Sequence, residues 1–308
     1  MAPSSHSVGG GTPPSGADSP APCPAEMFTA ADYRDYITAF NHGDFDEFGR
    51  YYTEDVEFHS RNGLFRGREA VTDFYRQVRA RLRERIEIRQ VVIGKGELMA
   101  DAVTHLEAFE DWPELPSGPM AKGETRRSEN FIWYELRNRQ FSRIRSANFR
   151  RGEDLSDEPP LPQAHPGGTI IGAEQFARYI DAFNRDDYAQ FAQFYAPDIT
   201  LVIAGKHRLT GREAILDFYK AVKAQTRRTI EIKRVISAPH ALAAELRSEF
   251  LALRDLPDFA AGPMRKHERL LINTFVLYDL REGRFARVRS AELRKVRRAG
   301  PGSPEQEL

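Results

Sequence analysis

The sequence predicts an α+β fold in two domains, and three observations lead to it. Residues 67–151 align without a gap with residues 211–295, and about 34 of the 85 aligned pairs are identical. Within each copy, apolar residues at helical spacing come first. Strand-like alternation follows, which predicts helices packed on one antiparallel sheet. A repeat this long exceeds the roughly 20–50 residues of a solenoid unit, so each copy is a domain.

The ends of the chain and the stretch between the copies have a different composition. The first 26 residues are mostly Ser, Pro, Gly and Ala, which cannot bury enough apolar surface to order. The stretch between the copies is rich in Pro, Gly and acidic residues, as in a linker. The predicted division is a disordered tail at 1–26, domain 1 at 27–151, a linker at 152–168, domain 2 at 169–298 and a tail at 299–308.

Three helices are predicted at the start of each copy. Thr29 is the expected N-cap of the first, whose apolar residues follow the spacing i, i+3, i+4, i+7. A short second helix is rich in aromatic residues, and a third begins after Gly67 or Gly211. The apolar stripe of the first helix is Tyr33, Tyr36, Ile37 and Phe40 in copy one and Phe176, Tyr179, Ile180 and Phe183 in copy two.

Strands make up the rest of each copy. The alternation predicts a first strand at 56–59, then strands at 86–91, 98–110, 128–136 and 141–149. Residues 137–140 form the last turn, and its counterpart contains Gly283, which suits the positive φ of a hairpin. The expected result is a curved sheet wrapped against the helices.

Composition limits the function classes. Lys and Arg total 45, equal to Asp and Glu, which argues against general binding of nucleic acid or anionic membranes. The arginine run at 79–85 is therefore read as a solvated helix face. The single Cys23 supplies no disulfide framework and no thiolate metal site. With no secretory signal and no long apolar run, we expect a cytoplasmic protein.

The order of the predicted elements and the short sequence motifs of each copy resemble those of the NTF2-like superfamily and, within it, the SnoaL-like branch. Ala39-Phe40-Asn41 ends the first helix, an aromatic-rich segment covers 51–58, and Gly67-Arg68-Glu69-Ala70 starts the third helix. The final hairpin completes the pattern. The resemblance implies cone-shaped domains with a pocket between sheet and helices. Because many members are dimers, it also implies an intrachain pseudo-dimer, with a higher oligomer left open.

What the resemblance implies about activity is broader. The superfamily includes polyketide cyclases, a ketosteroid isomerase, dehydratases, epoxide hydrolases and inactive binding modules. In its enzymes, a polar group deep in an apolar cone has a shifted pKa and moves a proton next to a carbonyl. This chemistry needs no cofactor, and because the histidines are scattered along the chain we expect no metal site.

The catalytic candidates come from the first helix and two long strands. Tyr36 and Tyr179 lie on the inward stripe, where the resemblance implies a pocket tyrosine and the alternative is a core residue. His105 has a side chain whose pKa lies near neutrality, and Glu249 replaces it in copy two. Both could instead face solvent. Glu129 alternates with apolar neighbours and could face the pocket or an edge.

The binding candidates are less specific. Arg145 and Arg289 could hold a carboxylate or phenolate, although an interdomain salt bridge is favoured. His59 could line the mouth of the cone. Asn273, which replaces Glu129, would only hydrogen-bond, and Tyr52 and Tyr195 complete the set. The shared loop at 111–120 is expected to contact the partner domain rather than to cover the pocket.

The predicted function is a cofactor-independent cyclase, isomerase or dehydratase acting on a hydrophobic, carbonyl-bearing small molecule of polyketide or terpenoid type. His105 would be the base, with Tyr36 and Glu129 polarising the substrate. Copy two would use Glu249 and Tyr179 or act as a structural partner. The alternative is a non-catalytic binding or scaffold module. Neither nucleic acid nor a membrane is expected as a partner.

Overall fold

The computed structural model describes residues 27–60, 63–155, 170–300 and 303–308. The predicted tail at 1–26 and most of the predicted linker lie outside these residues. Domain 1 contains α1 (Ala30–His42), α2 (Phe45–Gly49), β1 (Tyr52–Ser60), β2 (Gly63–Arg66), α3 (Arg68–Arg81), β3 (Leu82–Gly94), β4 (Glu97–Ala108), β5 (Thr125–Arg137) and β6 (Gln140–Arg151). Domain 2 contains α4 (Ala173–Asn184), α5 (Tyr188–Ala192), β7 (Tyr195–Ile203), β8 (His207–Thr210), α6 (Arg212–Gln225), β9 (Thr226–Ala238), β10 (Ala241–Ala252), β11 (Arg269–Arg281) and β12 (Arg284–Arg298).

The first helix begins and ends where its sequence indicates. The Thr29 side chain accepts a hydrogen bond from the Asp32 amide at 3.2 Å, and the Asp32 carboxylate accepts one from the Thr29 amide at 2.7 Å. This reciprocal capping box satisfies two amides that the helix itself leaves unpaired. At the other end, Gly43 has a φ of 73°, which lets the chain turn out of the helix. The predicted N-cap is confirmed.

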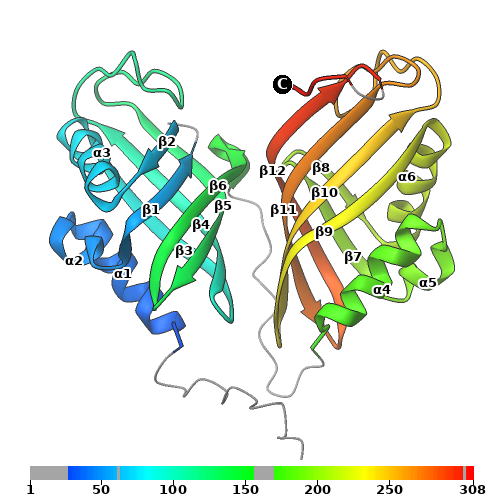
Figure 1. The fold of residues 1–308 in the computed structure, drawn as a ribbon, viewed down its shortest axis with the longest axis horizontal. Helices are drawn as coiled ribbons and strands as arrows, with labels where there is room; N and C mark the ends of the chain where they lie inside the picture. Colours follow the sequence, from blue (N-terminus) through cyan, green and yellow to red (C-terminus); the bar gives the residue numbers. More distant parts are fainter. Residues whose placement is uncertain (1–26, 61–62, 156–169, 301–302) are drawn as a thin grey trace, which may run out of the picture.

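Each domain is a curved sheet with its helices on the concave side (Figure 1). The strand order is β2-β1-β6-β5-β4-β3 in domain 1 and β8-β7-β12-β11-β10-β9 in domain 2. Within these two orders β1 runs parallel to β6 and β7 parallel to β12, and the other pairs are antiparallel. The α+β prediction is confirmed. Two elements, β2 and β8, were not predicted, because four residues are too few to show a period.

The hairpin between β5 and β6 turns through two residues of left-handed backbone. Asn138 and Arg139 have φ values of 51° and 63°, and Glu282 and Gly283 have values of 53° and 69° at the equivalent turn. Turns of this kind match the twist of the flanking strands. The glycine predicted for positive φ is therefore confirmed at Gly283.

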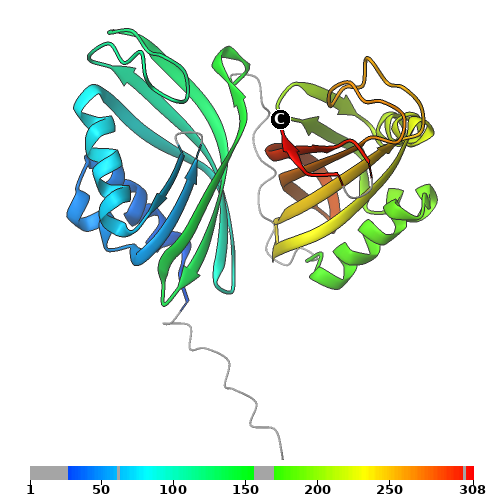
Figure 2. The ribbon, with the colours of Figure 1, turned by 45° about the horizontal axis from the view of Figure 1, so that its top comes forward.

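The two sheets meet through their convex faces, and the helices lie on the outer sides of the molecule (Figures 1 and 2). β6 lies against β12 and β3 against β9. Trp133 of domain 1 is fully buried and stacks on Phe275 of domain 2 with ring centroids 5.5 Å apart. The other buried apolar members of this interface include Val92, Met99, Phe131, Ala147, Phe149, Val202, Ile236, Leu277 and Ala291.

One glycine shows how closely the domains approach. Gly205, in the turn between β7 and β8, has a φ of 68°, and a Cβ added there would lie 2.2 Å from the Phe149 carbonyl oxygen of domain 1. A side chain at this position would collide with a backbone that cannot move aside. The two domains are thus packed together through close backbone contacts as well as through apolar side chains.

Both predicted boundaries beyond the domains need adjustment. The linker was expected from residue 152, but Gly152–Leu155 form a short 3-10 helix whose Leu155 is buried. The segment from 299 was expected to be a loose tail, but Gln306–Glu307 form β13 against β12. Ion pairs explain the second difference, because Glu305 contacts Arg298 and Glu307 lies 3.3 Å from Arg294.

We expect Trp133→Ala to lower the free energy of unfolding by about 3–5 kcal/mol, the usual cost of truncating a buried aromatic side chain. Because its ring stacks on Phe275 across the interface, the double variant with Phe275→Ala should cost less than the two single losses combined. Denaturant unfolding of the four proteins measures this coupling. Additive losses would mean that the two domains do not stabilise each other through these rings.

Candidate active site

Domain 1 has a partly open cavity of about 150 Å³ between α3 and the concave face of its sheet. One wall is apolar and contains rings and aliphatic side chains from α1, α3 and most of the strands. The other wall is a strip of polar groups, mainly on β4, β5 and β6, and it includes the charged Arg151. The apolar wall includes Tyr36, Phe58, Phe74, Val78, Leu82, Ile86, Leu106, Leu115, Ile132 and Ile144, and the polar strip Ser60, Thr104, Ser117, Ser128, Asn130, Ser146 and Asn148.

Glu84 is the acidic residue in this lining. It lies on β3 between Leu82 and Ile86 as the inward member of the alternation, so its remaining exposure is toward the cavity. Burial raises the pKa of the Glu84 carboxyl to about 7, against the opposing attraction of the Arg79 guanidinium. Among the described residues it has no hydrogen-bond or ion-pair partner within bonding distance. A carboxyl group in this state can donate or accept a proton near neutral pH.

Tyr75 supplies a second proton donor in the same cavity. Burial raises the pKa of its hydroxyl well above the usual value, and the Glu84 carboxylate adds to the shift. The phenol therefore stays protonated and can donate a hydrogen bond to an oxygen that gains negative charge. Arg79 lies one helical turn after Tyr75 on α3. Its guanidinium contacts the Phe40 carbonyl oxygen at the end of α1, which holds it away from the cavity.

The polar strip is ordered by its own hydrogen bonds. The Asn130 side-chain amide donates to Thr104 Oγ1 at 3.2 Å and to Ser128 Oγ at 3.1 Å, and its oxygen accepts from Asn148 Nδ2 at 3.1 Å. Such a network fixes the direction of each amide before a ligand arrives. The strip can therefore orient a carbonyl or hydroxyl group opposite the apolar wall.

Domain 2 has a different interior at the same positions. The counterpart of Glu84 is Arg228, whose guanidinium carbon lies 4.8 Å from the centroid of the Phe250 ring and 5.3 Å from that of Tyr219. Phe250 replaces Leu106 and packs on Phe259, which replaces Leu115, with centroids 5.5 Å apart. Three larger side chains thus occupy the space that domain 1 leaves open around its acid.

The four predicted tyrosines lie on the concave side of their sheets, but their hydroxyls are paired with one another. Tyr36 bonds Tyr52 through their hydroxyls at 2.8 Å, and Tyr179 bonds Tyr195 in the same way at 2.8 Å. Tyr36 also lines the cavity with its ring. These tyrosines therefore fit the alternative given by the sequence, that of core residues with locally satisfied hydroxyls. A role as catalytic hydrogen-bond donors is not supported for them.

His105 and Glu249 lie on the convex faces of their sheets, away from the concave sides. His105 alternates with Thr104 and Leu106, which line the cavity, and its Nε2 lies 3.2 Å from Glu87 on β3. Glu249 forms an ion pair with Arg269 on the convex face of domain 2. The predicted base in each domain is thus corrected, because strand alternation directs both side chains away from the cone.

Glu129 also faces away from the cavity, although it is fully buried. Its carboxylate lies at the domain interface, 2.6 Å from Arg150 Nε and 3.1 Å from Arg289 Nη1. Phe131 and Trp133, the apolar residues that alternate with Glu129, belong to the domain interface. Their burial therefore did not mean that this face of the strand lines the cone. Burial and the neighbouring Asp101 raise the pKa of the Glu129 carboxyl to about 7. His105, Glu129 and Tyr36 therefore do not converge on one cavity.

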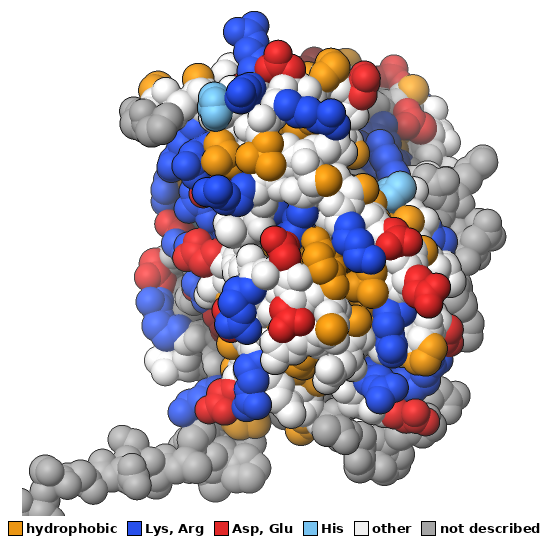
Figure 3. Space-filling model, turned by 90° about the vertical axis from the view of Figure 1, so that its right-hand side faces the viewer, with side chains coloured by type: hydrophobic (Ala, Val, Ile, Leu, Met, Phe, Trp, Pro, Cys, Tyr) orange, Lys and Arg blue, Asp and Glu red, His pale blue; other side chains and the backbone are white. Residues whose placement is uncertain are grey.

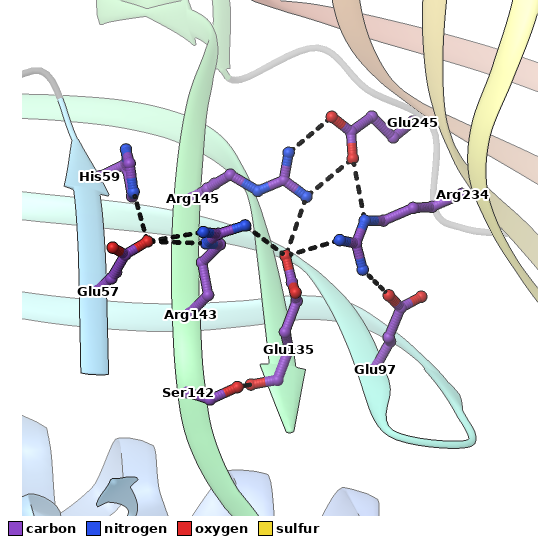
Figure 4. Close-up of polar contacts among 9 residues, drawn as sticks. All are labelled: Glu57, His59, Glu97, Glu135, Ser142, Arg143, Arg145, Arg234 and Glu245. Atoms are coloured by element: carbon purple, nitrogen blue, oxygen red, sulfur yellow. Dashed lines mark hydrogen bonds and ion pairs between the residues drawn. The ribbon is translucent and has the colours of Figure 1, made fainter. Parts of the chain in front are cut away.

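The predicted arginine sites are interdomain ion pairs, and Figure 4 shows those around Arg145. Arg145 donates to both oxygens of Glu245, at 2.6 and 2.8 Å, and Arg234 lies 3.1 Å from Glu135 and also contacts Glu97. Arg289 pairs with Asp101, the domain 1 counterpart of Glu245, on the other side of the pseudo-twofold axis. The salt-bridge alternative favoured from the sequence is what the structure contains, so neither Arg145 nor Arg289 is placed to bind a substrate in a cone.

Two further binding candidates also lie on convex faces. His59 lies 3.4 Å from Glu57, which in turn is 2.7 Å from Arg143 (Figure 4). Its neighbours Phe58 and Ser60 line the cavity, so the alternation places His59 on the opposite side. Asn273 alternates with residues of the domain 2 interior and is likewise outside it.

The loop between β4 and β5 covers the cavity instead of contacting the other domain. Leu115 and Ser117 line the cavity, and Trp112, Leu115 and Met120 form an apolar cluster with Val78 of α3. The Ser117 carbonyl oxygen also accepts hydrogen bonds from arginines on β5 and β6. The partner-contact prediction for this loop is therefore corrected.

Sequence reasoning missed Glu84 because of the arginines around it. The run at 79–85 was read as one helix face, but α3 ends at Arg81 and β3 begins at Leu82. Arg83 then points outward, 2.8 Å from Glu107, and Glu84 points inward. A signal existed in the repeat, since the pair Glu84 and Arg228 reverses the sign of the charge at this position of the cone.

Other classes of site find no support among the described residues. No group of three or more His, Cys, Asp or Glu side chains within residues 27–60, 63–155, 170–300 and 303–308 could hold a metal ion. No helix within the same ranges is long and apolar enough to span a membrane. The face that carries α4, α5 and α6 shows basic and acidic side chains interspersed (Figure 3).

The cone, the helices over its concave face and the acid inside it can be compared with known proteins. The model of the SnoaL-like domain matches residues 33–144 and again residues 176–288. The chain belongs to the SnoaL-like family. Together the two matches cover well over half of its length, one in each domain. No curated protein matches the chain.

Several solved structures resemble parts of this SnoaL-like chain. A SnoaL-like polyketide cyclase from Agrobacterium tumefaciens has 18% identity over 38% of this chain and 87% of its own, with a TM-score of 0.31. SalBIII, an epoxide hydrolase/cyclase-like enzyme of pyran ring formation in salinomycin, has 20% identity over 39% and 88%, with a TM-score of 0.32. An LEH-like epoxide hydrolase from M. tuberculosis has 12% identity over 38% and 78%, with a TM-score of 0.32.

The raised pKa of Glu84 predicts a pH-dependent effect on stability. Between about pH 4.5 and 7 the folded protein holds a proton that the unfolded chain releases, so Glu84 makes stability fall as pH rises through this window. Glu84→Gln should therefore stabilise the protein at pH 8, by roughly 3 kcal/mol at most, and have little effect near pH 4.5. Denaturant unfolding at both pH values measures the difference.

Glu69→Gln is the matched control, because Glu69 is an exposed carboxylate on α3 and its replacement should have little effect at either pH. Equal effects of Glu84→Gln at pH 4.5 and pH 8 would show that the Glu84 carboxyl is not held in its protonated form by burial.

Proposed function

We propose that the domain 1 cavity catalyses proton transfer next to the carbonyl of a small, largely apolar molecule, as a cofactor-independent isomerase or cyclase does. The observation that carries the proposal is Glu84, a carboxyl group whose pKa burial raises to about 7 and which lines a cavity with one apolar and one polar wall. An acid or base works best when its pKa lies near the working pH. Glu84 meets this requirement inside the cavity, whereas His105 lies on the opposite face of the sheet and does not reach the cavity.

Each part of the cavity has a role in this reaction. The Glu84 carboxylate removes a proton from the carbon beside the carbonyl and returns it at another position of the same molecule, so no proton or electron is gained overall. The Tyr75 hydroxyl, or the amide of Asn130, donates a hydrogen bond to the carbonyl oxygen while it carries negative charge. The apolar wall excludes water, which keeps these interactions strong.

The size of the cavity limits the ligand. A space of about 150 Å³ accommodates a molecule of about the size of benzene. The enclosed part of the substrate is therefore about one six-membered ring, with the carbonyl toward the polar strip. Larger polycyclic substrates would have to extend past the loop that carries Leu115 and Ser117.

Domain 2 is proposed to have a structural role in the present chain. Its interior carries Arg228 where domain 1 carries Glu84, and a guanidinium cannot act as a base at neutral pH. The rings around Arg228 also occupy the equivalent space. One site per chain is the expected stoichiometry.

Exchange with deuterated water tests the proposal without a known substrate. The full chain is incubated in D₂O with one-ring ketones such as 2-cyclohexenone, and loss of the protons beside the carbonyl is followed by ¹H NMR. Glu84→Gln should slow the catalysed exchange by about 100-fold or more. The rate of the unaltered protein should rise with pH through about 7, as Glu84 becomes the carboxylate.

His105→Ala is the matched control, because His105 lies on the opposite face of the same sheet and its loss should leave the exchange rate unchanged. Exchange that persists at the original rate in Glu84→Gln would contradict the proposal. Tight binding of these ketones by a protein that never accelerates exchange would favour a binding module instead.

A further inference from the structure

Arg289 of domain 2 reaches into the sheet of domain 1. It lies on β12 and is fully buried, and its Nη1 contacts the carboxylates of Asp101 and Glu129. Its Nη2 donates to Gln90 Oε1 at 3.1 Å. These three partners belong to β4, β5 and β3, so one guanidinium from the second domain joins three neighbouring strands of the first.

The contact with Glu129 lies directly behind the polar strip of the cavity. Glu129 stands between Ser128 and Asn130, which both line the cavity, and the pairing of β5 with β6 is irregular between Glu129 and Asn130. An irregularity of this kind redirects the side chains next to it. The orientation of Asn130 therefore depends on how the backbone at Glu129 is held.

Asn148 closes the connection from the other strand. Its Nδ2 donates to the Glu129 carbonyl oxygen at 3.2 Å, to Asn130 Oδ1 at 3.1 Å and to the Arg150 carbonyl oxygen at 3.2 Å. Arg150 in turn donates through Nε to the Glu129 carboxylate at 2.6 Å. The side chain of Glu129 is thus held by guanidinium groups from both domains, and its main chain by the amide that points into the cavity.

Domain 2 has no equivalent of this arrangement. At the positions of Glu129, Asn130 and Asn148 it carries Asn273, Thr274 and Glu292. The symmetry-related Arg145 binds Glu245, the counterpart of Asp101, but has no counterpart of Glu129 to hold. The asymmetry occurs on the side where the cavity contains an acid.

We propose that Arg289 is a positioning residue for the domain 1 cavity: by holding Glu129, it fixes the amide pair of Asn130 and Asn148 that orients the ligand's oxygen. The site in domain 1 is then incomplete without the second copy. The inference rests on the proposed function only in assuming that a ligand's oxygen binds in this cavity. The positions of the two amides can be measured without any ligand.

The experiment uses the full chain and the side-chain amide signals of Asn130 and Asn148 in ¹H–¹⁵N spectra, assigned by replacing each asparagine in turn with aspartate. Arg289→Met should shift or broaden both amide signals, because Glu129 loses the guanidinium from domain 2. Arg145→Met, which removes the symmetry-related interdomain pair, should leave both signals in place. Arg289→Lys keeps the charge but not the paired donors, so it should shift the signals less than Arg289→Met does.

A second measurement separates positioning from simple loss of stability. In the D₂O exchange assay, Arg289→Met should lower the rate constant at saturating ketone about tenfold while the pH midpoint set by Glu84 stays near 7. If Arg289→Met does not fold, Arg289→Lys is measured in its place. Folded variants of Arg289 whose Asn130 and Asn148 signals match the unaltered protein would overturn the inference. Failure of Glu84→Gln to slow exchange would overturn only the proposed function.

Discussion

The convex faces of the two sheets are buried against each other, and the rest of the molecule depends on this packing. A sheet that used only its concave face would leave Trp133 and Phe275 exposed to water. Once the sheets are packed, the convex faces of the central strands are buried, and the polar groups on these faces must find partners across the interface. Arg289, which is fully buried, and Arg145, which is partly buried, are those partners, and neither is a ligand of a substrate.

The same packing explains why one chain contains two copies with different interiors. A half-buried carboxyl group whose pKa is raised destabilises the folded protein at neutral pH, and Glu84, which has no partner among the described residues, is such a group. Domain 2 carries Arg228 at this position and surrounds it with rings, so its interior is filled. The second copy can then stabilise the interface while only the first bears the cost of an open cavity with an acid inside. This division is the physical basis of the single site proposed here.

Much of this could be predicted from the sequence, and the part that could not has a definite cause. Helical and strand periods located the helices and long strands of both copies, and the repeat identified two domains. The prediction of the site residues was wrong at one step, which was the choice of the strand face that lines the cavity. Glu129 alternates with Phe131 and Trp133, and an apolar alternation normally marks the core; here it marked the interface. Glu84 was hidden because its neighbours Arg83 and Arg85 made its segment look like a solvated helix. The change from helix to strand at Leu82 reverses which of these side chains points inward.

One carboxyl group inside domain 1, that of Glu84, has a pKa that burial raises to about 7. A direct measurement is the ¹³C titration of its side-chain carboxyl in protein labelled at glutamate, assigned through the signal that disappears in Glu84→Gln. A midpoint of about 7 is expected for this signal. A midpoint below 5, as for an ordinary exposed glutamate, would rule out the role assigned to Glu84, because its carboxyl would then be ionised and solvated at neutral pH and would not exchange a proton there.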